Sequence, residues 1–340
     1  MPAPTPTTPP KGLGRFGLDS FVFLLLGVVV LAYLWPEPAL RPGTFSLDAV
    51  ATVGVSLIFF FYGLRLSPDK LRAGLRNGRL HALIHLTTFG LFPLVVLGVK
   101  PLLVGTPQET LWPGLFFLAA LPSTVSSSVV MVSIARGNLP AAIFNASISS
   151  LLGVFLTPLW MSLVPDSVPG GTIDIGPVVG KLVGQVLLPV GLGIALHRWG
   201  GAAAERWKNG LKRFDQSVIL LIVYTSFGES FATDQFAGTS AGVLVALGVG
   251  MLALFLLVYV LINRLCRWLG FSREDRITAV FCGSKKSLVH GSVMAQVLFP
   301  GTAAVGVLLL PLLLYHALQL IAASVLAQLE ARRASAPTLT

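Results

Sequence analysis

Residues 240–262 form an apolar segment without a single charged side chain. About 20 mostly apolar residues are enough for a helix to cross the hydrocarbon core of a bilayer. Hydrophobic residues make up 54% of the chain and charged residues 11%, whereas a soluble domain is about one-quarter charged. No water-soluble core of this size could bury so much apolar surface. The chain is therefore predicted to be an all-α polytopic membrane protein. The same apolar composition excludes a disordered chain, and two cysteines are too few for a disulfide scaffold.

Nine further segments have the length and composition of membrane spans, so we expect ten transmembrane helices. Residues 164–176 are rich in Pro, Gly and Asp and predict a loop between the fifth and sixth spans. The ten predicted spans are 21–35, 47–64, 80–99, 110–135, 139–164, 177–196, 216–233, 240–262, 277–299 and 302–327.

Basic residues gather in alternate loops, and this asymmetry predicts the orientation of the chain. With both termini cytoplasmic, 19 of the 24 Lys and Arg residues lie on the cytoplasmic side, and Arg41, Lys100 and Lys181 lie outside. The net charge of +10 then reflects topology and contact with anionic lipid, and no nucleic-acid partner is expected. We expect a multi-pass protein of the plasma (inner) membrane.

Four cytoplasmic segments are predicted outside the spans. Residues 1–18 are rich in Pro and Thr and are expected to be disordered, and residues 328–340 form a tail. Residues 67–76 and 201–214 combine basic side chains with apolar ones at helical spacing. This pattern predicts short amphipathic helices on the membrane surface, with charged surface turns as the alternative.

The spans divide into two halves of five, at residues 19–164 and 177–327. Because five is an odd number, the second half must be inverted relative to the first, as in many secondary transporters. Residues 128–131 and 291–294 are a short sequence match between the two halves. The sequence therefore predicts two inverted five-helix repeats.

Spans four and nine each carry a polar stretch near their centre. In span four, Pro122 removes a backbone donor, and a run of hydroxyl residues follows it. A cation at the bilayer centre costs at least about 2.5–3.5 kcal/mol on insertion scales, and span nine places two lysines there. Broken helices at matching positions of inverted halves mark a midplane binding site. Its candidate substrate or ion ligands are Ser126, Ser127, Ser128, Ser284, Lys285, Lys286 and Ser287.

Two alternatives explain the same residues. A miscounted span would leave the lysine pair in a loop, and the Ser, Lys and His content of span nine could belong to a Ser–Lys hydrolase. Further candidate ligands inside spans are Thr88, Asn145, Ser149, Glu229 and His290. Glu229 is expected to be functional or a counter-ion of the lysines, because an unpaired carboxylate at that depth is costly. For Thr88, Asn145 and Ser149, and for Tyr315, His316 and Gln319 in span ten, each taken singly, hydrogen bonding between helices is the favoured role.

Several of these motifs resemble the bile acid:sodium symporter superfamily. They lie at residues 60–68, 121–128, 135–138, 156–158 and 283–287. The chain is similar from about residue 16 to residue 327 to the branch that includes vertebrate solute carrier family 10 member 7 and bacterial sodium-dependent transporters. This resemblance implies a panel domain of spans 1, 2, 6 and 7 and a core domain of spans 3–5 and 8–10. It also implies that broken spans four and nine cross.

The resemblance also implies two sodium sites, whose family ligands are partly replaced in this chain. At the second site, Thr88 and Lys285 stand where the family has glutamines. At the first site Ser128 keeps the family's serine, Asn145 and Ser149 lie nearby, and the other ligand positions hold Val129, Ala142, Ala146 and Phe281. We therefore expect the pair Lys285 and Lys286 to replace at least one sodium ion as the positive charge of the site. A proton, or a sodium ion near Ser128 and Asn145, is the candidate coupling ion.

The sequence predicts a secondary active transporter of a small organic solute that works by alternating access. The lysine pair favours an anionic substrate, and the lipid bilayer is the other expected partner. A non-transporting membrane regulator or scaffold on the same fold is the alternative. An enzyme is not expected, because the chain has no Gly-rich phosphate loop, no clustered Cys and His ligands and no Gly-x-Ser-x-Gly motif. No organic cofactor is expected.

Overall fold

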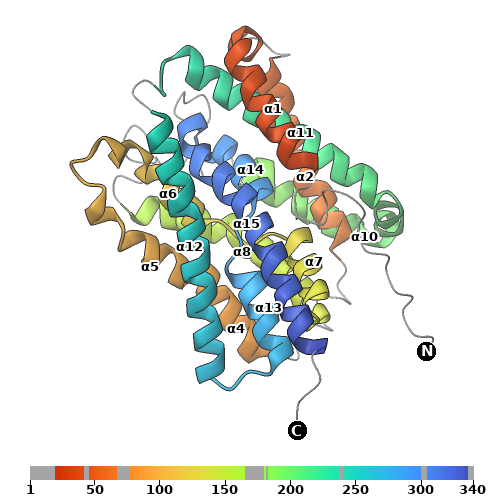
Figure 1. Ribbon diagram of the computed structural model, residues 1–340. Helices are drawn as coiled ribbons and strands as arrows, with labels where there is room; N and C mark the ends of the chain where they lie inside the picture. The colour runs from red at the N-terminus through yellow and green to blue at the C-terminus, as the bar shows by residue number, and fades with distance from the viewer. Residues whose placement is uncertain are drawn as a thin grey trace.

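The computed structural model describes residues 20–41, 46–66, 77–164, 180, 183–236, 240–299 and 305–335, and every regular element within them is helical (Figure 1). The predicted segments 1–18 and 67–76, and most of the loop at 164–176, lie outside the described residues. The elements are α1 (Ser20–Leu34), η2 (Glu37–Leu40), α2 (Leu47–Arg65), α4 (Gly78–Leu86), η3 (Thr87–Leu91), α5 (Phe92–Leu97), η4 (Lys100–Leu102), η5 (Pro107–Leu111), α6 (Trp112–Ala120), α7 (Ser126–Ile134), α8 (Leu139–Leu163), η6 (Val183–Leu187), α10 (Leu188–Arg206), α11 (Lys208–Ala232), α12 (Ala241–Trp268), α13 (Arg273–Gly283), α14 (Leu288–Leu298) and α15 (Val305–Ser335).

Six helical segments of the described chain are long and apolar enough to cross a membrane by length and composition. They are Leu47–Arg65, Gly78–Leu102, Leu139–Leu163, Val183–Arg206, Ala241–Trp268 and Val305–Arg333. Large apolar side chains remain exposed on the outer faces of the helices, with Val245 at 67% and Leu24 at 55% exposure. These faces suit lipid tails. The molecule is an all-helical membrane protein, as the composition predicts.

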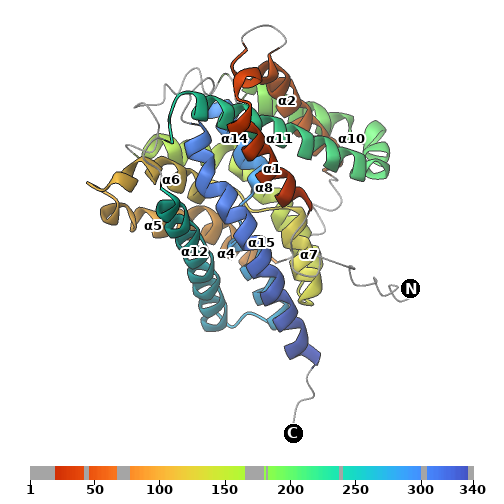
Figure 2. The same cartoon turned by 45° about the horizontal axis from the view of Figure 1, so that its top comes forward.

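Helices α1, α2, α10 and α11 form one group, which lies toward the top of the molecule in Figures 1 and 2. We call this group the panel. Within the panel, the backbones of α2 and α10 approach each other closely at glycine residues. A Cβ on Gly193 would lie 2.2 Å from the carbonyl oxygen of Phe60, and one on Gly63 would lie 2.3 Å from the carbonyl oxygen of Val190. Glycine is required at both positions because the two backbones touch.

The remaining α-helices, α4–α8 and α12–α15, form a second group that we call the core. Helix α15 contacts α6, α7, α12 and α14, and α13 contacts α4, α7, α8 and α12. The core meets the panel where α11 packs against α14 and α15, and where α14 packs against α2.

Two features of the helices differ from the sequence prediction. The prediction of a separate surface helix at residues 201–214 is wrong, because α10 continues to Arg206 and α11 begins at Lys208. Ala202, Ala203, Ala204 and Glu205 favour helix, so the chain turns only at Trp207. The third predicted span, at 80–99, is not one uniform helix. A π-helical turn, η3, interrupts it at Thr87–Leu91.

Candidate functional site

Span four is broken after Ala120. Leu121, the residue before Pro122, has extended backbone angles (φ −71°, ψ 153°), as expected for a residue that precedes proline. Helix α7 begins at Ser126, so the chain between the two helices is not helical. Gly153 of α8 lies beneath this break, where a Cβ would come 2.6 Å from the Pro122 ring.

Span nine is broken at its lysine pair. Helix α13 ends at Gly283, and α14 begins at Leu288 with Ser287 as its N-cap. The Ser287 hydroxyl accepts a hydrogen bond from the His290 amide at 3.3 Å and lies 3.0 Å from His290 Nδ1. The two breaks meet directly, because the Ser287 amide donates to the Pro122 carbonyl at 2.9 Å.

Four carbonyl groups at the break in span four accept hydrogen bonds from other parts of the core. Ala119 and Leu121 accept from the Lys286 ammonium at 2.6 and 2.8 Å. Ala120 accepts from the Thr157 hydroxyl at 2.9 Å, and Pro122 accepts from Ser287. Buried backbone groups without partners are costly, so these donors stabilise the broken helix.

Lys286 is fully buried and makes a third bond to a different part of the core. Its Nζ donates to the Thr88 carbonyl at 2.8 Å, which belongs to the π-helical turn η3. The face of the Phe92 ring lies 4.2 Å from the same nitrogen. The sequence prediction singled out the side chain of Thr88, but its hydroxyl bonds to Ile84 and only its carbonyl reaches the lysine.

Lys285 is also fully buried but points to a different partner. Its Nζ donates to the Ser127 hydroxyl at 2.7 Å. Ser127 donates in turn to the Thr124 hydroxyl at 2.9 Å, and Thr124 and Ser128 share a hydrogen bond of 2.7 Å. The hydroxyl run of span four thus forms a chain of hydrogen bonds that starts at a lysine of span nine.

Helix α15 holds the lysine stretch through two side chains four residues apart. The Gln319 amide donates to the Lys286 carbonyl at 2.7 Å and accepts from the Lys286 amide at 2.9 Å. The Tyr315 hydroxyl donates to the Ser284 carbonyl at 2.6 Å. Both residues were expected to join helices. Their i, i+4 spacing places both side chains on the same face of α15.

A cavity of about 620 Å³ lies between the panel and the core. Aromatic and aliphatic side chains form most of its wall, many of them from α2, α8 and α14, and Ser127 and His290 bring it to the two broken helices. The Tyr62 hydroxyl, which also lines it, donates to the Ser147 carbonyl at 2.7 Å and so links panel to core. The charged side chains that line the cavity are Arg65, Glu205, Lys208, Lys212 and Asp215, and we call this charged part of the lining its mouth.

Asp215 lies at the mouth of the cavity, before the apolar part of α11. Burial raises the pKa of its carboxyl group to about 6, and the charge of Arg65 opposes this rise. The charge at the mouth therefore changes near neutral pH. At the other end of the panel, Gln296 donates to Asp48, and the Gly306 amide donates to the Ser230 hydroxyl at 3.1 Å. Those contacts close the panel against the core.

Of the other predicted site residues, Ser149, Ser284 and Asn145 have no contact with either lysine side chain among the contacts described. Ser149 accepts from the Ser123 amide at 3.0 Å, and Ser284 bonds to the Val280 carbonyl. Asn145 donates to the Ala141 carbonyl, and its side-chain oxygen is buried without a partner among the described residues. Ser126 begins α7, but its side chain lies outside the described set.

Glu229 is separate from the lysine pair. It lies near the end of α11, where Asp48 is the charged side chain that acts on it. No ion pair joins it to either lysine in the described part of the chain, and it does not line the cavity. Within the same part of the chain, no three His, Cys, Asp or Glu side chains gather where they could hold a metal ion.

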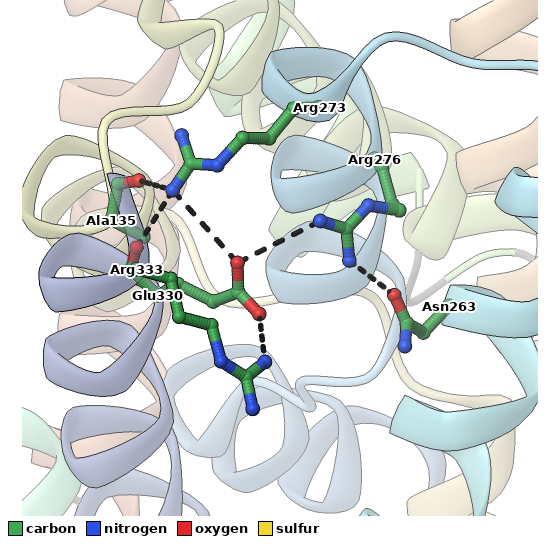
Figure 3. Close-up of polar contacts among 6 residues, drawn as sticks. All are labelled: Ala135, Asn263, Arg273, Arg276, Glu330 and Arg333. Carbon is green, nitrogen blue, oxygen red and sulfur yellow. Dashed lines mark hydrogen bonds and ion pairs between the residues drawn. The ribbon is translucent and has the colours of Figure 1, made fainter. Parts of the chain in front are cut away.

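A second polar cluster fixes the far end of the core (Figure 3). Glu330 of α15, with 7% of its side chain exposed, pairs with Arg333 at 3.0 Å, with Arg276 at 3.7 Å and with Arg273 at 3.8 Å. Arg273 also donates to the Ala135 carbonyl at 3.3 Å, and Arg276 donates to Asn263 at 2.6 Å. These contacts join the loop after α7 to α12, α13 and α15, so this end of the core is held as one unit.

A helical membrane protein with a cavity between two groups of helices has the construction of a transporter, and the comparisons with known proteins agree. The model of the SBF-like CPA transporter family matches residues 19–332, so the chain belongs to that family. PA2026 of Pseudomonas aeruginosa is 44% identical over 321 residues, which cover 94% of this chain and 95% of that protein. YfeH of Escherichia coli is 39% identical over 319 residues, which cover 92% of each chain.

A vertebrate relative connects the family to the predicted superfamily. Sodium/bile acid cotransporter 7 of Rattus norvegicus is 30% identical over 312 residues, which cover 89% of this chain and 91% of that protein. The predicted resemblance to bile acid:sodium symporters is therefore confirmed. The protein is a membrane transporter of the bile acid:sodium symporter type.

Proposed function

We propose that the protein is a secondary transporter of a small organic anion and works by alternating access of the core against the panel. The ten spans then form two inverted repeats, at residues 19–164 and 177–327. The cavity between panel and core carries the proposal. It reaches the crossing of the two broken helices through Ser127 and His290, which is where transporters of inverted-repeat design bind their substrates.

The walls of the cavity favour an anion with an apolar body. Phe59, Phe61 and Leu288 are among the side chains that offer apolar surface, and Ser127 is bonded to the Lys285 ammonium behind it. At the mouth, three cationic side chains outnumber two carboxylates. A vertebrate relative is named for bile acids, which are anions with large apolar bodies, so taurocholate is the first probe.

We infer that the cavity opens toward the cytoplasm. The residues at its mouth, Arg65, Lys208 and Lys212, belong to the basic side of the chain, and basic loops favour the cytoplasmic side. Both termini are then cytoplasmic, in the plasma membrane. The contacts of Asp48 with Gln296 and of Ser230 with Gly306 would close the external side in this state.

The test is uptake of labelled taurocholate and other organic anions into proteoliposomes, with counterflow to separate transport from binding. We expect saturable uptake by the wild type and at least a tenfold loss in Ser127→Ala. Ser133→Ala is the matched control, because Ser133 lies on the same helix with an exposed side chain. Sodium and choline buffers at several pH values distinguish sodium coupling near Ser128 and Asn145 from proton coupling. If a panel of anions gives neither uptake nor thermal stabilisation, the non-transporting scaffold is the better explanation.

A further inference from the structure

The three carbonyl groups around Lys286 converge on a single point. The oxygens of Thr88, Ala119 and Leu121 lie 2.6–2.8 Å from its Nζ. They come from two separate spans, and Lys286 comes from a third. We call these three oxygens and the face of Phe92, 4.2 Å away, the carbonyl cage.

The backbone creates the cage independently of the lysine. Ala119 lies in the last turn of α6, where carbonyl groups have no partner within the helix. Leu121 lies in the extended break, and Thr88 lies in the π-helical turn. The C-terminal end of a helix also carries partial negative charge. The electrostatic potential inside this buried cage is therefore negative because of the backbone alone, without any contribution from a side chain.

The geometry requires a cation in the cage. A lysine ammonium has three N–H donors and no acceptor, and the cage offers three acceptors. A neutral amine would have only two donors and would turn its lone pair toward a carbonyl oxygen. The aromatic face adds a further attraction for positive charge. Rings of backbone carbonyl oxygens of this kind hold alkali cations in ion channels.

We propose that Lys286 is a tethered cation that permanently fills a monovalent-cation site of the core, and that Lys285 alone serves the anion in the cavity. The statement about Lys286 concerns folding and ion binding and stands without transport, whereas the role of Lys285 rests on the proposed function. Because the site carries its own cation, the crossing of the broken helices forms without an alkali ion. Removal of the Lys286 side chain should turn the cage into an open site for sodium or for methylammonium.

The test measures the melting temperature of the full-length protein in detergent, in equal concentrations of sodium, methylammonium and choline chloride. The wild type should melt at the same temperature in methylammonium as in choline, because Lys286 already fills the cage. Lys286→Ala should melt lower in choline and recover by about 5 °C in sodium or methylammonium, because a ligand that binds the folded state raises its melting point. Lys285→Ala is the matched control and should also melt at the same temperature in methylammonium as in choline.

Two results would overturn the proposal. One is a wild type that gains as much from methylammonium over choline as Lys286→Ala does. The other is a Lys286→Ala protein that gains nothing. If that variant cannot be purified in any of the three salts, the same comparison is made with Lys286→Gln, whose shorter neutral side chain leaves part of the cage open. A lack of cation preference there overturns the proposal too. None of these measurements depends on uptake, so a failed transport assay leaves them intact.

Discussion

The panel and the core bury their backbones by opposite means. In the panel, continuous helices satisfy their own hydrogen bonds, and α2 and α10 touch through Gly63 and Gly193. In the core, spans four and nine are broken, and side chains such as Lys286 and Gln319 supply the missing donors and acceptors. Irregular backbone at membrane depth is stable only when protein groups satisfy it. The comparison teaches that close backbone contact joins α2 and α10 in the panel, whereas specific polar side chains hold the two breaks of the core and create its site.

The largest effect is expected where the core loses the donor of its carbonyl cage. Lys286→Met keeps the length of the side chain but leaves three buried carbonyl groups without a donor. Each unsatisfied buried group costs about 1–3 kcal/mol, so we expect a loss of about 3–5 kcal/mol in the free energy of unfolding. Denaturation followed by tryptophan fluorescence in detergent measures it.

Lys285→Met is the control for that variant, because Lys285 has one hydroxyl partner, Ser127, in the described structure. It should cost clearly less stability than Lys286→Met. Sodium should not restore Lys286→Met, since the thioether still occupies the cage. Equal losses in the two variants would show that the carbonyl partners are not what distinguishes the lysines.

The next effect concerns shape in the panel. A Cβ on Gly193 would lie 2.2 Å from the Phe60 carbonyl oxygen, so Gly193→Ala must push α2 and α10 apart. Overpacking of this kind costs about 1–3 kcal/mol. Gly191→Ala, on the same helix with nothing within 4 Å of the new atom, should be neutral or slightly stabilising. A drop of melting temperature in Gly191→Ala as large as that in Gly193→Ala would contradict the close approach.

A smaller effect is expected at the far end of the core. Glu330→Gln leaves Arg273, Arg276 and Arg333 without the carboxylate that pairs with them, and this carboxylate is almost buried. We expect a loss of about 1–2 kcal/mol, because exposed pairs contribute about 0–1 kcal/mol and buried ones more. Glu205→Gln removes a pair with Lys208 whose side chains are about half exposed, and should change the melting temperature very little. A larger loss of stability in Glu205→Gln than in Glu330→Gln would mean that the cluster around Glu330 does not stabilise the core.

The parts of the molecule that local sequence encodes were predictable. Pro122 and the lysine pair marked both breaks, because proline and charge are rare inside an apolar span. The partners of Lys286 were not predictable, since Thr88 and Ala119 lie 198 and 167 residues away along the chain. A pattern identifies a polar residue in a span, but only the fold determines which backbone groups face it.

Three local features that differ from the predictions have physical causes as well. The π-helical turn at Thr87–Leu91 contains two Thr and one Gly, but these residues also occur in regular membrane helices, so they do not predict a change of helix type. The helix expected at 201–214 merges into α10 and α11, since its alanine-rich start continues the preceding helix. Glu229 was expected to be functional or a counter-ion of the lysines, because an unpaired carboxylate inside a span is costly. Its position near the end of α11 with Asp48 shows that depth in the membrane does not specify a partner.

The smallest predicted effect tests the boundary between panel and core, at the cavity mouth. Burial raises the pKa of Asp215 to about 6, so its carboxylate is mostly charged at pH 7.5 and mostly neutral at pH 5. A negative charge at the mouth repels an anionic ligand. Binding of an organic anion should therefore strengthen as the pH falls through 6, by up to about fivefold if one unit charge acts with roughly 1 kcal/mol. Isothermal titration with taurocholate between pH 5 and pH 8 measures this slope.

Asp215→Asn fixes the neutral state and identifies the group responsible. This variant should bind at pH 7.5 about as well as the wild type binds at pH 5, and its affinity should not change between these pH values. The pH dependence of stability is an independent test of the raised pKa of Asp215. A carboxyl group whose pKa is higher in the folded protein than in the unfolded chain favours folding below its unfolded value, and that advantage is lost as the pH rises through about 6. Asp215→Asn should therefore flatten the fall of melting temperature between pH 4 and pH 7. A variant that keeps the wild-type slope in both measurements would place the titrating group elsewhere and leave the mouth of the cavity without a role in anion binding.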